Sequence, residues 1–451
     1  MTSLFNPIDI LNDSINDIAK NIKNYCQNPG KDFTRSRKLP VERLIKLILE
    51  SEGNSIDAEL FKSFPDANER MTASAFVQQR GKLKHEAFRD ILRSLDGYMD
   101  NTKRFKGYRI LAIDGTDLYF PANPDSKCFV KRYRKRNDGT EMKNYCLLHA
   151  NILYDVLNKQ YLDCLSVPKG GEGGNERKYA AIFIDNYEAD DVIMVMDRGY
   201  TSYNIIKHCE RANKYFICRS ITGKGAFKEI EELDNVVTDN WVNIKITTVP
   251  KKKYLDNGYK LLQVIKKHYK NQSLFDSKRM NTASRRQWDF EEACTITYRI
   301  LKFQLDNGNW EVLITNLPNS FTMEEIKKIY GMRWGIETSF RDLKYAVGAI
   351  QFHSKQDEFV KQELYAHLVM YNVISACGNN IEIPNKDLKY NYAIDFKMAV
   401  HVVRSFFRKG IDSFIELNKE LSRYLQPVRP NRSDLRKVQP RSPVFFIYRV
   451  A

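Results

Sequence analysis

The sequence is poor in the residues that bind transition metals. Its 8 cysteines and 7 histidines are dispersed singly along 451 residues, with no Cys-x-x-Cys pair and no histidine at zinc-finger spacing. We therefore expect reduced cytosolic thiols, and we expect any bound metal to be held by carboxylates.

Long hydrophobic runs are also absent. No apolar stretch approaches the roughly 18 to 20 residues that cross a membrane. The amino terminus lacks the basic stretch and apolar core of a signal peptide. These absences argue against a transmembrane or exported protein and predict a cytoplasmic one with no membrane partner.

Acidic residues are too few to balance the basic ones. The chain has 72 Lys and Arg against 56 Asp and Glu, a net charge of +16. Residues 251–290 alone hold 11 basic and 3 acidic residues, a net +8 that is half of the total. Such an excess favours a polyanionic partner, most simply nucleic acid, with ribosomal and membrane-surface roles as alternatives.

What is present suffices for a large folded protein. Hydrophobic residues make up 43% of the chain, enough for two or three domains. Residues 39–95 alternate helical patterns with polar breaks and predict a small helical domain. Its last segment would form either a DNA-contacting helix pair or a solvated helix face, because it carries four basic residues among apolar ones: Arg80, Lys82, Lys84 and Arg89.

The pattern changes near residue 109, where strands and helices begin to alternate. ILAID, LLHANILYD and QYLDCLSV predict three strands, the last two joined as a hairpin over 155–159. A helix over 177–186, a buried strand VIMVM, a helix over 203–212 and a strand YFICR follow. This alternation predicts an α/β sheet. Residues 221–318 then become strand-like and basic, and helices return further on.

Two aspartates occupy matching positions. Asp114 closes ILAID, and Asp197 closes VIMVM. Open α/β sheets place their sites at the carboxyl ends of strands, where a hard divalent cation finds carboxylate ligands. Aspartate also simply marks the turn after a strand, so both interpretations stay open. Asp117, two or three residues past the strand end, is a competing candidate.

The most informative segment is TMEEIKKIYGMRWGIETSFRDLKYAVG, residues 322–348. Thr322 and Glu325 predict a capping box, and apolar positions recur at helical spacing. Along one continuous α-helix, four polar side chains would lie within about 60° of one another: Tyr330, Arg333, Glu337 and Lys344. A salt-bridged surface face is the alternative, although such a face requires neither the tyrosine nor the two helix-weakening glycines.

Three carboxylates supplied by two strands and a helix suit phosphodiester chemistry. Asp114, Asp197 and Glu337 could hold two Mg²⁺ ions, or Mn²⁺. One ion would activate the attacking oxygen and the other would stabilise the leaving oxygen. Cations on the same helical face would bind the phosphates. The sequence therefore points to strand cleavage or strand transfer on nucleic acid.

These motifs resemble a known family, the bacterial insertion-sequence transposases of the DDE class. The spacing of the family's YREK signature is similar to that of Tyr330-x2-Arg333-x3-Glu337-x6-Lys344. The DGT at Asp114 and the DRGY at Asp197 resemble the family's first and second acidic motifs. The resemblance runs from roughly Phe33 to the basic tail.

The resemblance implies a ribonuclease H-like α/β fold, with a mixed sheet, a β-rich insertion, a helical N-terminal domain and a helical C-terminal region. The expected segments are a helical DNA-binding domain at 1–105, the first part of the catalytic core at 106–220, the basic insertion at 221–318, the second part of the core with the YREK helix at 319–377, and a helical region with a basic tail at 378–451.

The resemblance also implies roles for single residues. Asp114, Asp197 and Glu337 would form the catalytic, metal-binding triad. Four residues would contact DNA phosphates: Tyr330, Arg333, Lys344 and Arg198. In similar transposases a tryptophan of the insertion stacks on a base flipped from the DNA end, and Trp310 stands in the corresponding place. Packing in the core is the alternative for Trp310.

The implied partner is double-stranded DNA, both the terminal inverted repeats and the target, bound by a homodimer in a bacterial, nucleoid-associated complex. The basic run 131–136 is either a DNA contact or a solvated loop, and Trp334 either packs or touches DNA. The leading hypothesis is a cut-and-paste transposase that excises through a hairpin end. A metal-dependent nuclease without strand transfer and a catalytically silent DNA-binding relative remain as alternatives.

Overall fold

The computed structural model describes most of the chain. The described residues are 6–35, 39–99, 102–131, 144–169, 176–262, 288–350, 352, 354–379, 381, 391–410 and 413–428. They form two compact units: the first comprises Met1–Lys103, Gly115–Gly174 and Gly335–Ala451, and the second comprises Arg104–Asp114 and Asn175–Trp334. Among the described residues, no helix is both long and apolar enough to cross a membrane.

The first unit begins and ends with helices. The N-terminal ones are α1 (Pro7–Lys20), α2 (Ile22–Tyr25), α3 (Val41–Glu50), α4 (Ile56–Ser63), α5 (Ala73–Arg80) and α6 (Glu86–Tyr98). The C-terminal elements are α13 (Trp334–Asp342), the π-helix η3 (Leu343–Val347), α14 (Asp357–Asn379), β11 (Asn391–Ile394), α15 (Phe396–Lys409), α16 (Phe414–Leu421) and β12 (Leu425–Val428). Helix α14 is buried along most of its length and packs against α3, α6 and α15. It is therefore the central helix of this unit.

The strands of the first unit form one edge of the sheet, and α14 packs against its strand β4. The strand order is β2 (Phe129–Val130), β3 (Tyr145–Asp155) and the second half of β1 (Arg109–Pro121), with β4 (Gln160–Pro168) also paired to β3. The side chain of Asn372 on α14 bonds both the N–H and the carbonyl oxygen of Tyr161 at 2.7 Å each. These bonds satisfy backbone groups that an edge strand leaves open.

The predicted β3–β4 hairpin is confirmed, and its turn has a local cause. Asp155 is buried at the end of β3, and its Oδ1 accepts from the N–H groups of Leu157 at 3.1 Å and Asn158 at 3.0 Å. An aspartate that accepts bonds from the two or three following residues fixes a turn. Lys159 completes it with φ 55°.

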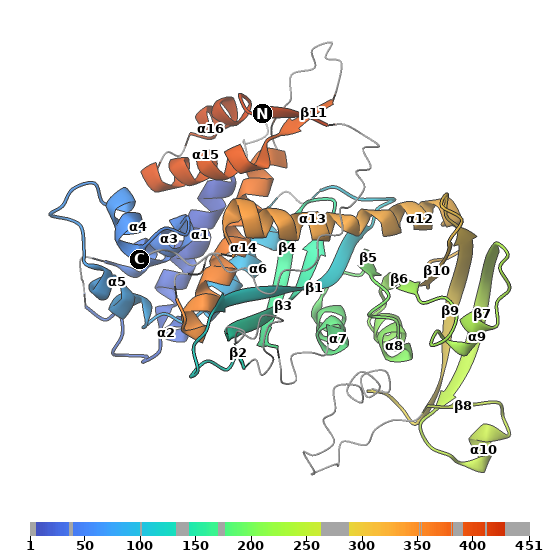
Figure 1. Cartoon of the computed structure of the whole chain (residues 1–451). Helices are drawn as coiled ribbons and strands as arrows, with labels where there is room; N and C mark the ends of the chain where they lie inside the picture. The colour runs from blue at the N-terminus through green and yellow to red at the C-terminus, as the bar shows by residue number, and fades with distance from the viewer. Residues whose placement is uncertain are drawn as a thin grey trace, which may run out of the picture. The chain divides into compact units, whose positions relative to one another are not determined.

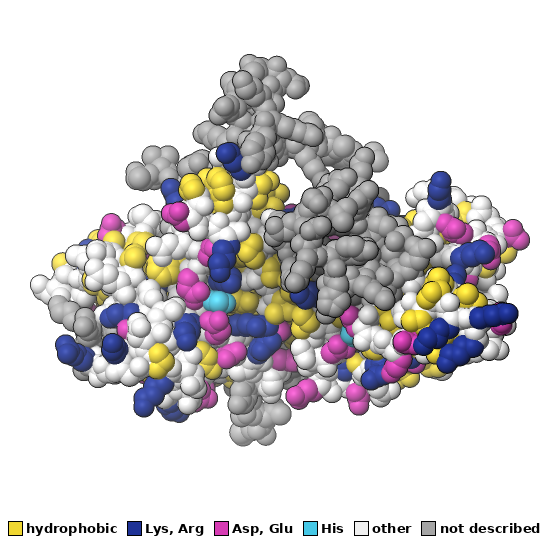
Figure 2. Space-filling model, turned by 90° about the horizontal axis from the view of Figure 1, so that it is seen from below, with side chains coloured by type: hydrophobic (Ala, Val, Ile, Leu, Met, Phe, Trp, Pro, Cys, Tyr) yellow, Lys and Arg dark blue, Asp and Glu magenta, His cyan; other side chains and the backbone are white. Residues whose placement is uncertain are grey.

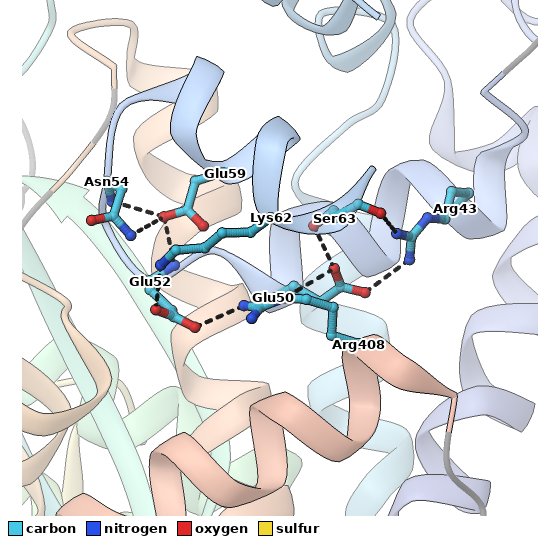
Figure 3. A network of polar contacts seen from close by, with 8 residues as sticks. All are labelled: Arg43, Glu50, Glu52, Asn54, Glu59, Lys62, Ser63 and Arg408. Carbon is cyan, nitrogen blue, oxygen red and sulfur yellow. Dashed lines mark hydrogen bonds and ion pairs between the residues drawn. The ribbon is translucent and has the colours of Figure 1, made fainter. Parts of the chain in front are cut away.

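A buried charge network joins the N-terminal helices to α15 (Figure 3). Glu50 is 1% exposed and pairs with Arg43 at 2.9 Å, while Ser63 donates to its other oxygen at 2.9 Å. Arg408 on α15 pairs with Glu52 at 2.7 Å. Because buried carboxylates need charged or hydrogen-bonding partners, this network fixes which helices meet in the unit.

The second unit is built on a longer sheet. It contains the first half of β1, then α7 (Glu176–Asn186), β5 (Val192–Met196), α8 (Tyr203–Arg211), β6 (Tyr215–Ser220), α9 (Lys228–Glu231), β7 (Thr238–Thr247), α10 (Lys252–Leu255), β8 (Lys260–Leu261), β9 (Ala293–Gln304), β10 (Trp310–Thr315) and α12 (Met323–Met332). The strand order is β1-β5-β6-β10-β9-β7-β8. The sheet is parallel from β1 through β5 to β6. From β6 onward each strand is antiparallel to the next, in the order β6, β10, β9 and β7. The predicted strand and helix positions are thus confirmed in type and nearly in length.

Helices cover the parallel strands of the second unit on both faces. Figure 1 shows α7 and α8 together on one side of β5 and β6, with α12 on the other, and the packing of α7 on α8 and of α12 on β6 agrees. All five residues of β5 are buried, which explains the uninterrupted apolar run VIMVM. The fold is therefore a mixed α/β sheet with a β-rich extension and additional helical regions.

The segment 322–348 is not one continuous helix, contrary to the sequence prediction. The capping box of Thr322 and Glu325 is confirmed at the start of α12. However, α12 ends at Met332, α13 begins at Trp334, and the chain changes to a π-helix at Leu343. A π-helix bonds residue i to i+5, so the rotation of 100° per residue does not hold as far as Lys344.

Candidate functional site

The structure brings Asp114 and Asp197 to neighbouring strands of the second unit. Strands β1 and β5 are parallel, and Ile113 pairs with Met196 at the last position of their ladder. Each aspartate directly follows its member of that pair. The sequence predicted that Asp114 closes its strand, but β1 continues to Pro121. Only the pairing of β1 with β5 stops before Asp114. Since adjacent strands lie about 4.8 Å apart, both carboxylates start from the same end of this ladder.

Hydrogen bonds hold the loop that follows β5. The N–H of Gly199 donates to Asp197 Oδ1 at 2.7 Å, and Arg177 Nε on α7 donates to the carbonyl oxygen of Gly199 at 2.8 Å. The thiol of Cys218 donates to the carbonyl oxygen of Asp197 at 3.1 Å. A Cβ atom on Gly199 would lie 2.9 Å from Asp197 Oδ1, so only glycine leaves this carboxylate in place. Arg198 is exposed beside it.

Arg333 connects the end of α12 to Asp114. Its Nη1 lies 3.6 Å from Asp114 Oδ2, although the arginine side chain is only 7% exposed. The guanidinium also lies 5.8 Å from the ring centre of Tyr330 and 5.3 Å from that of Trp334. Burial, opposed by the charge of Arg333, raises the pKa of Tyr330 to about 12, so the phenol stays protonated at neutral pH. Trp334 thus stacks on a site arginine, while half of its surface stays exposed.

Glu337 and Lys344 lie in the first unit. Glu337 is half-buried in the first turn of α13, where a negative charge is favoured by the helix dipole. Lys344 is half-buried in η3, which ends at Gly348 with φ 104°. Arg404 on α15 donates to the carbonyl oxygen of Val347 at 3.0 Å and so fixes the end of the π-helix.

Asp117 is an ion-pair centre of the first unit. Its Oδ1 lies 2.7 Å from His149 Nδ1, and its Oδ2 pairs with the ammonium of Lys169. Burial would raise the pKa of Asp117, but these hydrogen bonds and charges outweigh burial and lower it. Asp117 is therefore an ionised carboxylate whose two oxygens both have cationic or hydrogen-bonding partners. Neither His149 nor Lys169 stood out in the sequence.

One other cluster of ligand-type residues occurs. His85, Glu86 and Glu358 form the single group among the described residues with three potential ligand atoms all within 4.8 Å of one another. The N–H of His85 donates to Glu358 at 2.6 Å, and the imidazole contacts the same carboxylate at 2.9 Å. These bonds join the start of α6 to the start of α14, so we interpret this cluster as a contact between helices.

Two of the basic residues proposed for a DNA-binding helix pair are structural instead. Arg80 is 3% exposed, donates to Gln362 at 2.8 Å and pairs with Glu363 at 2.9 Å. Arg89 forms two bonds to Asp163, of 3.1 and 3.2 Å. Neither of the two expected roles, DNA contact or solvated face, applies to these arginines, because each has an acidic partner inside the unit.

The insertion is only partly described. Trp310 is half-buried at the start of β10, with Lys302 Nζ 5.7 Å from its ring centre. Most of the basic stretch 251–290 and nearly all of the run 131–136 lie outside the described residues. Figure 2 shows Lys and Arg side chains beside exposed apolar ones at the end of the second unit that carries β7 and β9. The described part of the insertion, residues 221–262 and 288–318, holds 9 basic and 11 acidic residues, so the basic excess expected for the insertion lies outside the described residues.

Comparison with known proteins decides the family. The sequence profile of the transposase DDE domain matches residues 105–373, a range that includes Asp114, Asp197 and Glu337. The chain belongs to the DDE transposase family. This transposase is 22% identical over 389 residues to the transposase InsG of insertion sequence element IS4 from Escherichia coli K12, covering 82% of this chain and 77% of InsG. The resemblance inferred from the motifs is confirmed.

Among solved structures, the chain matches that of the piggyBac transposase in a synaptic complex with hairpin DNA. The TM-score is 0.46 with 12% sequence identity, over 96% of this chain and 88% of the other. Members of the DDE family break and join phosphodiester bonds with divalent metal ions, which agrees with the hard oxygen donors of this transposase.

Proposed function

We propose that this transposase excises and reinserts an insertion sequence by a cut-and-paste reaction on double-stranded DNA. The observation that carries the proposal is the placement of Asp114 and Asp197 directly after the last pair of the parallel β1–β5 ladder, with Arg333 paired to the first aspartate. Glu337 follows that arginine by four residues. We assign these three carboxylates to one catalytic triad.

The two aspartates suit a divalent cation. Carboxylates are the ligands that Mg²⁺ and Mn²⁺ prefer. The glycine at position 199 leaves room for Asp197 Oδ1, which a Cβ atom there would displace. We assign two Mg²⁺ or Mn²⁺ ions to Asp114, Asp197 and Glu337. When bound, such ions activate the attacking oxygen and stabilise the leaving oxygen of a phosphodiester displacement.

The remaining signature residues would bind and orient the DNA end. Arg333, already buried beside two aromatic rings, presents a planar guanidinium suited to a phosphate. Tyr330, protonated at neutral pH, can donate to a phosphate oxygen. Lys344 and the exposed Arg198 would add phosphate contacts, and Trp310 would offer a stacking surface to an unpaired base.

We further propose a ribonuclease H-like core and a hairpin route. The parallel strands β1, β5 and β6 with helices on both faces support this core. In the proposed route, water cleaves one strand at the element end, and the freed 3′-hydroxyl attacks the opposite strand to form a hairpin. Water then opens the hairpin, and the 3′-hydroxyl joins target DNA. A homodimer would hold two ends on nucleoid DNA while this happens.

Cleavage of a labelled fragment that carries the element's own terminal repeats tests the proposal. With Mg²⁺, the wild type should nick the repeat boundary and then give a hairpin-length product on a denaturing gel. Glu337→Ala should bind the fragment and fail to cut it. Glu324→Ala is the matched control, because this glutamate is 77% exposed on the neighbouring helix α12. Cleavage by Glu337→Ala at the wild-type rate would rule out the proposed triad.

A pre-cut end separates a transposase from a nuclease of the same core. The fragment is supplied with its 3′-hydroxyl already exposed, together with a supercoiled plasmid. The proposed reaction gives a joined product that migrates with the plasmid. Cleavage of the uncut fragment without any joined product would identify a nuclease without strand transfer.

A further inference from the structure

Asp117 and its neighbours form a polar cluster from which the proposed function uses Lys344 alone. The cluster draws on four elements of the first unit: Asp117 on β1, His149 on β3, Lys169 after β4 and Lys344 on the π-helix. Elements far apart in the sequence thus bring two nitrogen-bearing side chains into contact with one carboxylate, whose charge also acts on a third.

The side chains of the cluster range from buried to exposed. His149 has a side-chain exposure of 3%, Asp117 of 26% and Lys169 of 41%. An ionised carboxylate can only accept, so the imidazole donates from Nδ1 across 2.7 Å. The N–H of Lys169 donates to the carbonyl oxygen of Leu147 at 3.1 Å, which anchors the backbone of this lysine to β3. The backbone of Lys169 is therefore held in place, and its side chain reaches solvent beside Asp117.

Lys344 feels the charge of the same carboxylate without a hydrogen bond or ion pair to it. Burial lowers the pKa of Lys344, and the negative charge of Asp117 opposes that effect. Within the described parts of the chain, the ammonium of Lys344 makes no hydrogen bond and no ion pair. Both oxygens of Asp117 are already engaged by His149 and Lys169. A half-buried cation has thus lost hydration without gaining a direct anionic contact.

A phosphodiester group has the negative charge and the acceptor oxygens that this cluster can bind. Asp117 bonds the ammonium of Lys169 and its charge also acts on that of Lys344, so one carboxylate serves two ammonium groups and one positive charge is left over. A phosphate carries one negative charge and several acceptor oxygens, and can accept from both ammonium groups at once. We propose that Lys169 and Lys344 together bind one backbone phosphate of the DNA, with Asp117 as the positioning residue that holds Lys169 in place. This assignment rests on the proposed action on DNA.

The assignment separates Asp117 from the metal chemistry. A carboxylate that bound a metal ion would lose cation binding when converted to an amide. A positioning residue would lose DNA affinity instead, although the conversion removes a negative charge near DNA. General electrostatics predicts the opposite sign, since removing that charge should strengthen binding. The direction of the change therefore distinguishes the three roles.

The first experiment measures DNA binding without chemistry. Fluorescence anisotropy with a labelled terminal-repeat duplex is recorded in EDTA over a series of salt concentrations. Lys169→Gln should raise Kd roughly three- to tenfold and lower the log–log salt slope by about 0.9, the value for one phosphate contact. Lys20→Gln should change neither, because Lys20 is 73% exposed in the same unit and pairs with Asp17. Lys169→Arg should restore most of the affinity.

A second set of variants tests the shared phosphate. Lys344→Gln should weaken binding, and the double variant Lys169→Gln/Lys344→Gln should lose less than the sum of the two single effects, because both lysines bind one group. Asp117→Asn should also weaken binding while leaving the heat of Mn²⁺ binding unchanged in calorimetry. Tighter DNA binding by Asp117→Asn, or loss of its Mn²⁺ heat, would overturn the positioning role.

Failure of this inference differs from failure of the proposed function. If the wild type binds the duplex but never cuts it, the proposed transposition is wrong while the binding comparison still stands. If the wild type cuts and joins DNA but Lys169→Gln binds with unchanged Kd and salt slope, the phosphate site is wrong. Lys169 is exposed, so its variant still decides the matter should Asp117→Asn fail to fold.

Discussion

Two pairs of basic residues in the first unit differ in what surrounds them. Arg80 and Arg89 come from the N-terminal helices, and each is matched by its own acidic partner. Lys169 and Lys344 share the single carboxylate of Asp117, which bonds only one of them. The first pair holds the unit together, and the second pair retains positive charge for a ligand. The acidic partner, and not the number of basic residues, decides between these roles.

The largest expected effect tests the first pair. Arg80→Ala should lower the free energy of unfolding by about 3–5 kcal/mol, because it leaves Glu363, 2% exposed, without this counter-ion. Lys169→Gln should change it by no more than about 0.5 kcal/mol, as exposed substitutions do. Denaturant titrations of both variants measure the difference. A similar loss of unfolding free energy in both variants would show that Arg80 and Lys169 do not differ in their structural role.

The second prediction moves to the second unit and concerns activity. Gly199→Ala should reduce DNA cleavage roughly 100-fold, the scale of a displaced catalytic group, because its Cβ would lie 2.9 Å from Asp197 Oδ1. Gly331→Ala is the control, since its Cβ meets nothing within 4 Å. That change lies in a helix and should raise stability by up to about 1 kcal/mol. Full cleavage by Gly199→Ala would show that Asp197 tolerates displacement.

The smallest effect is a pH dependence of the network that joins α15 to the N-terminal helices. Burial would raise the pKa of Glu52, but bonds from Arg408 and Lys62 outweigh it and lower the pKa to about 2. A depressed pKa stabilises the fold above the ordinary value of 4.5, and this stabilisation is lost as pH falls from there towards 2. After screening by solvent we expect about 1 kcal/mol.

Denaturation midpoints between pH 2 and pH 6 measure this effect. Wild type should lose stability more steeply than Glu52→Gln, which has no proton to gain at this position. Glu324→Gln serves as a control, because Glu324 is exposed and pairs with Lys327 along its own helix. Parallel curves for wild type and Glu52→Gln would assign the acid sensitivity to other groups.

Local patterns in the sequence predicted most elements correctly. The hairpin between β3 and β4 follows from apolar strands and a turn-forming Asp155, and the start of α12 follows from Thr322 and Glu325. The apolar run of β5 likewise predicted a buried strand. Each of these features depends on residues close together in the chain, so the sequence carries the information directly.

The candidate site was predictable in its residue types and less so in its geometry. Regular helical spacing suggested one face for Tyr330 to Lys344, but the break after Met332 and the π-helix at Leu343 interrupt that spacing. Bonds from elsewhere in the fold support the irregular segment, including that of Arg404 to Val347. Such bonds join residues far apart in the chain, so a periodicity argument cannot include them.

The sequence by itself determined the family, the strand-end aspartates and the order of the motifs, because these depend on residue type and spacing. Tertiary structure alone decided that Arg80 is buried beside an acid, that Asp117 pairs with His149 and Lys169, and that Gly199 lies against Asp197. The physical reason is that burial and ion pairing depend on partners supplied by distant segments, and only packing brings those segments together.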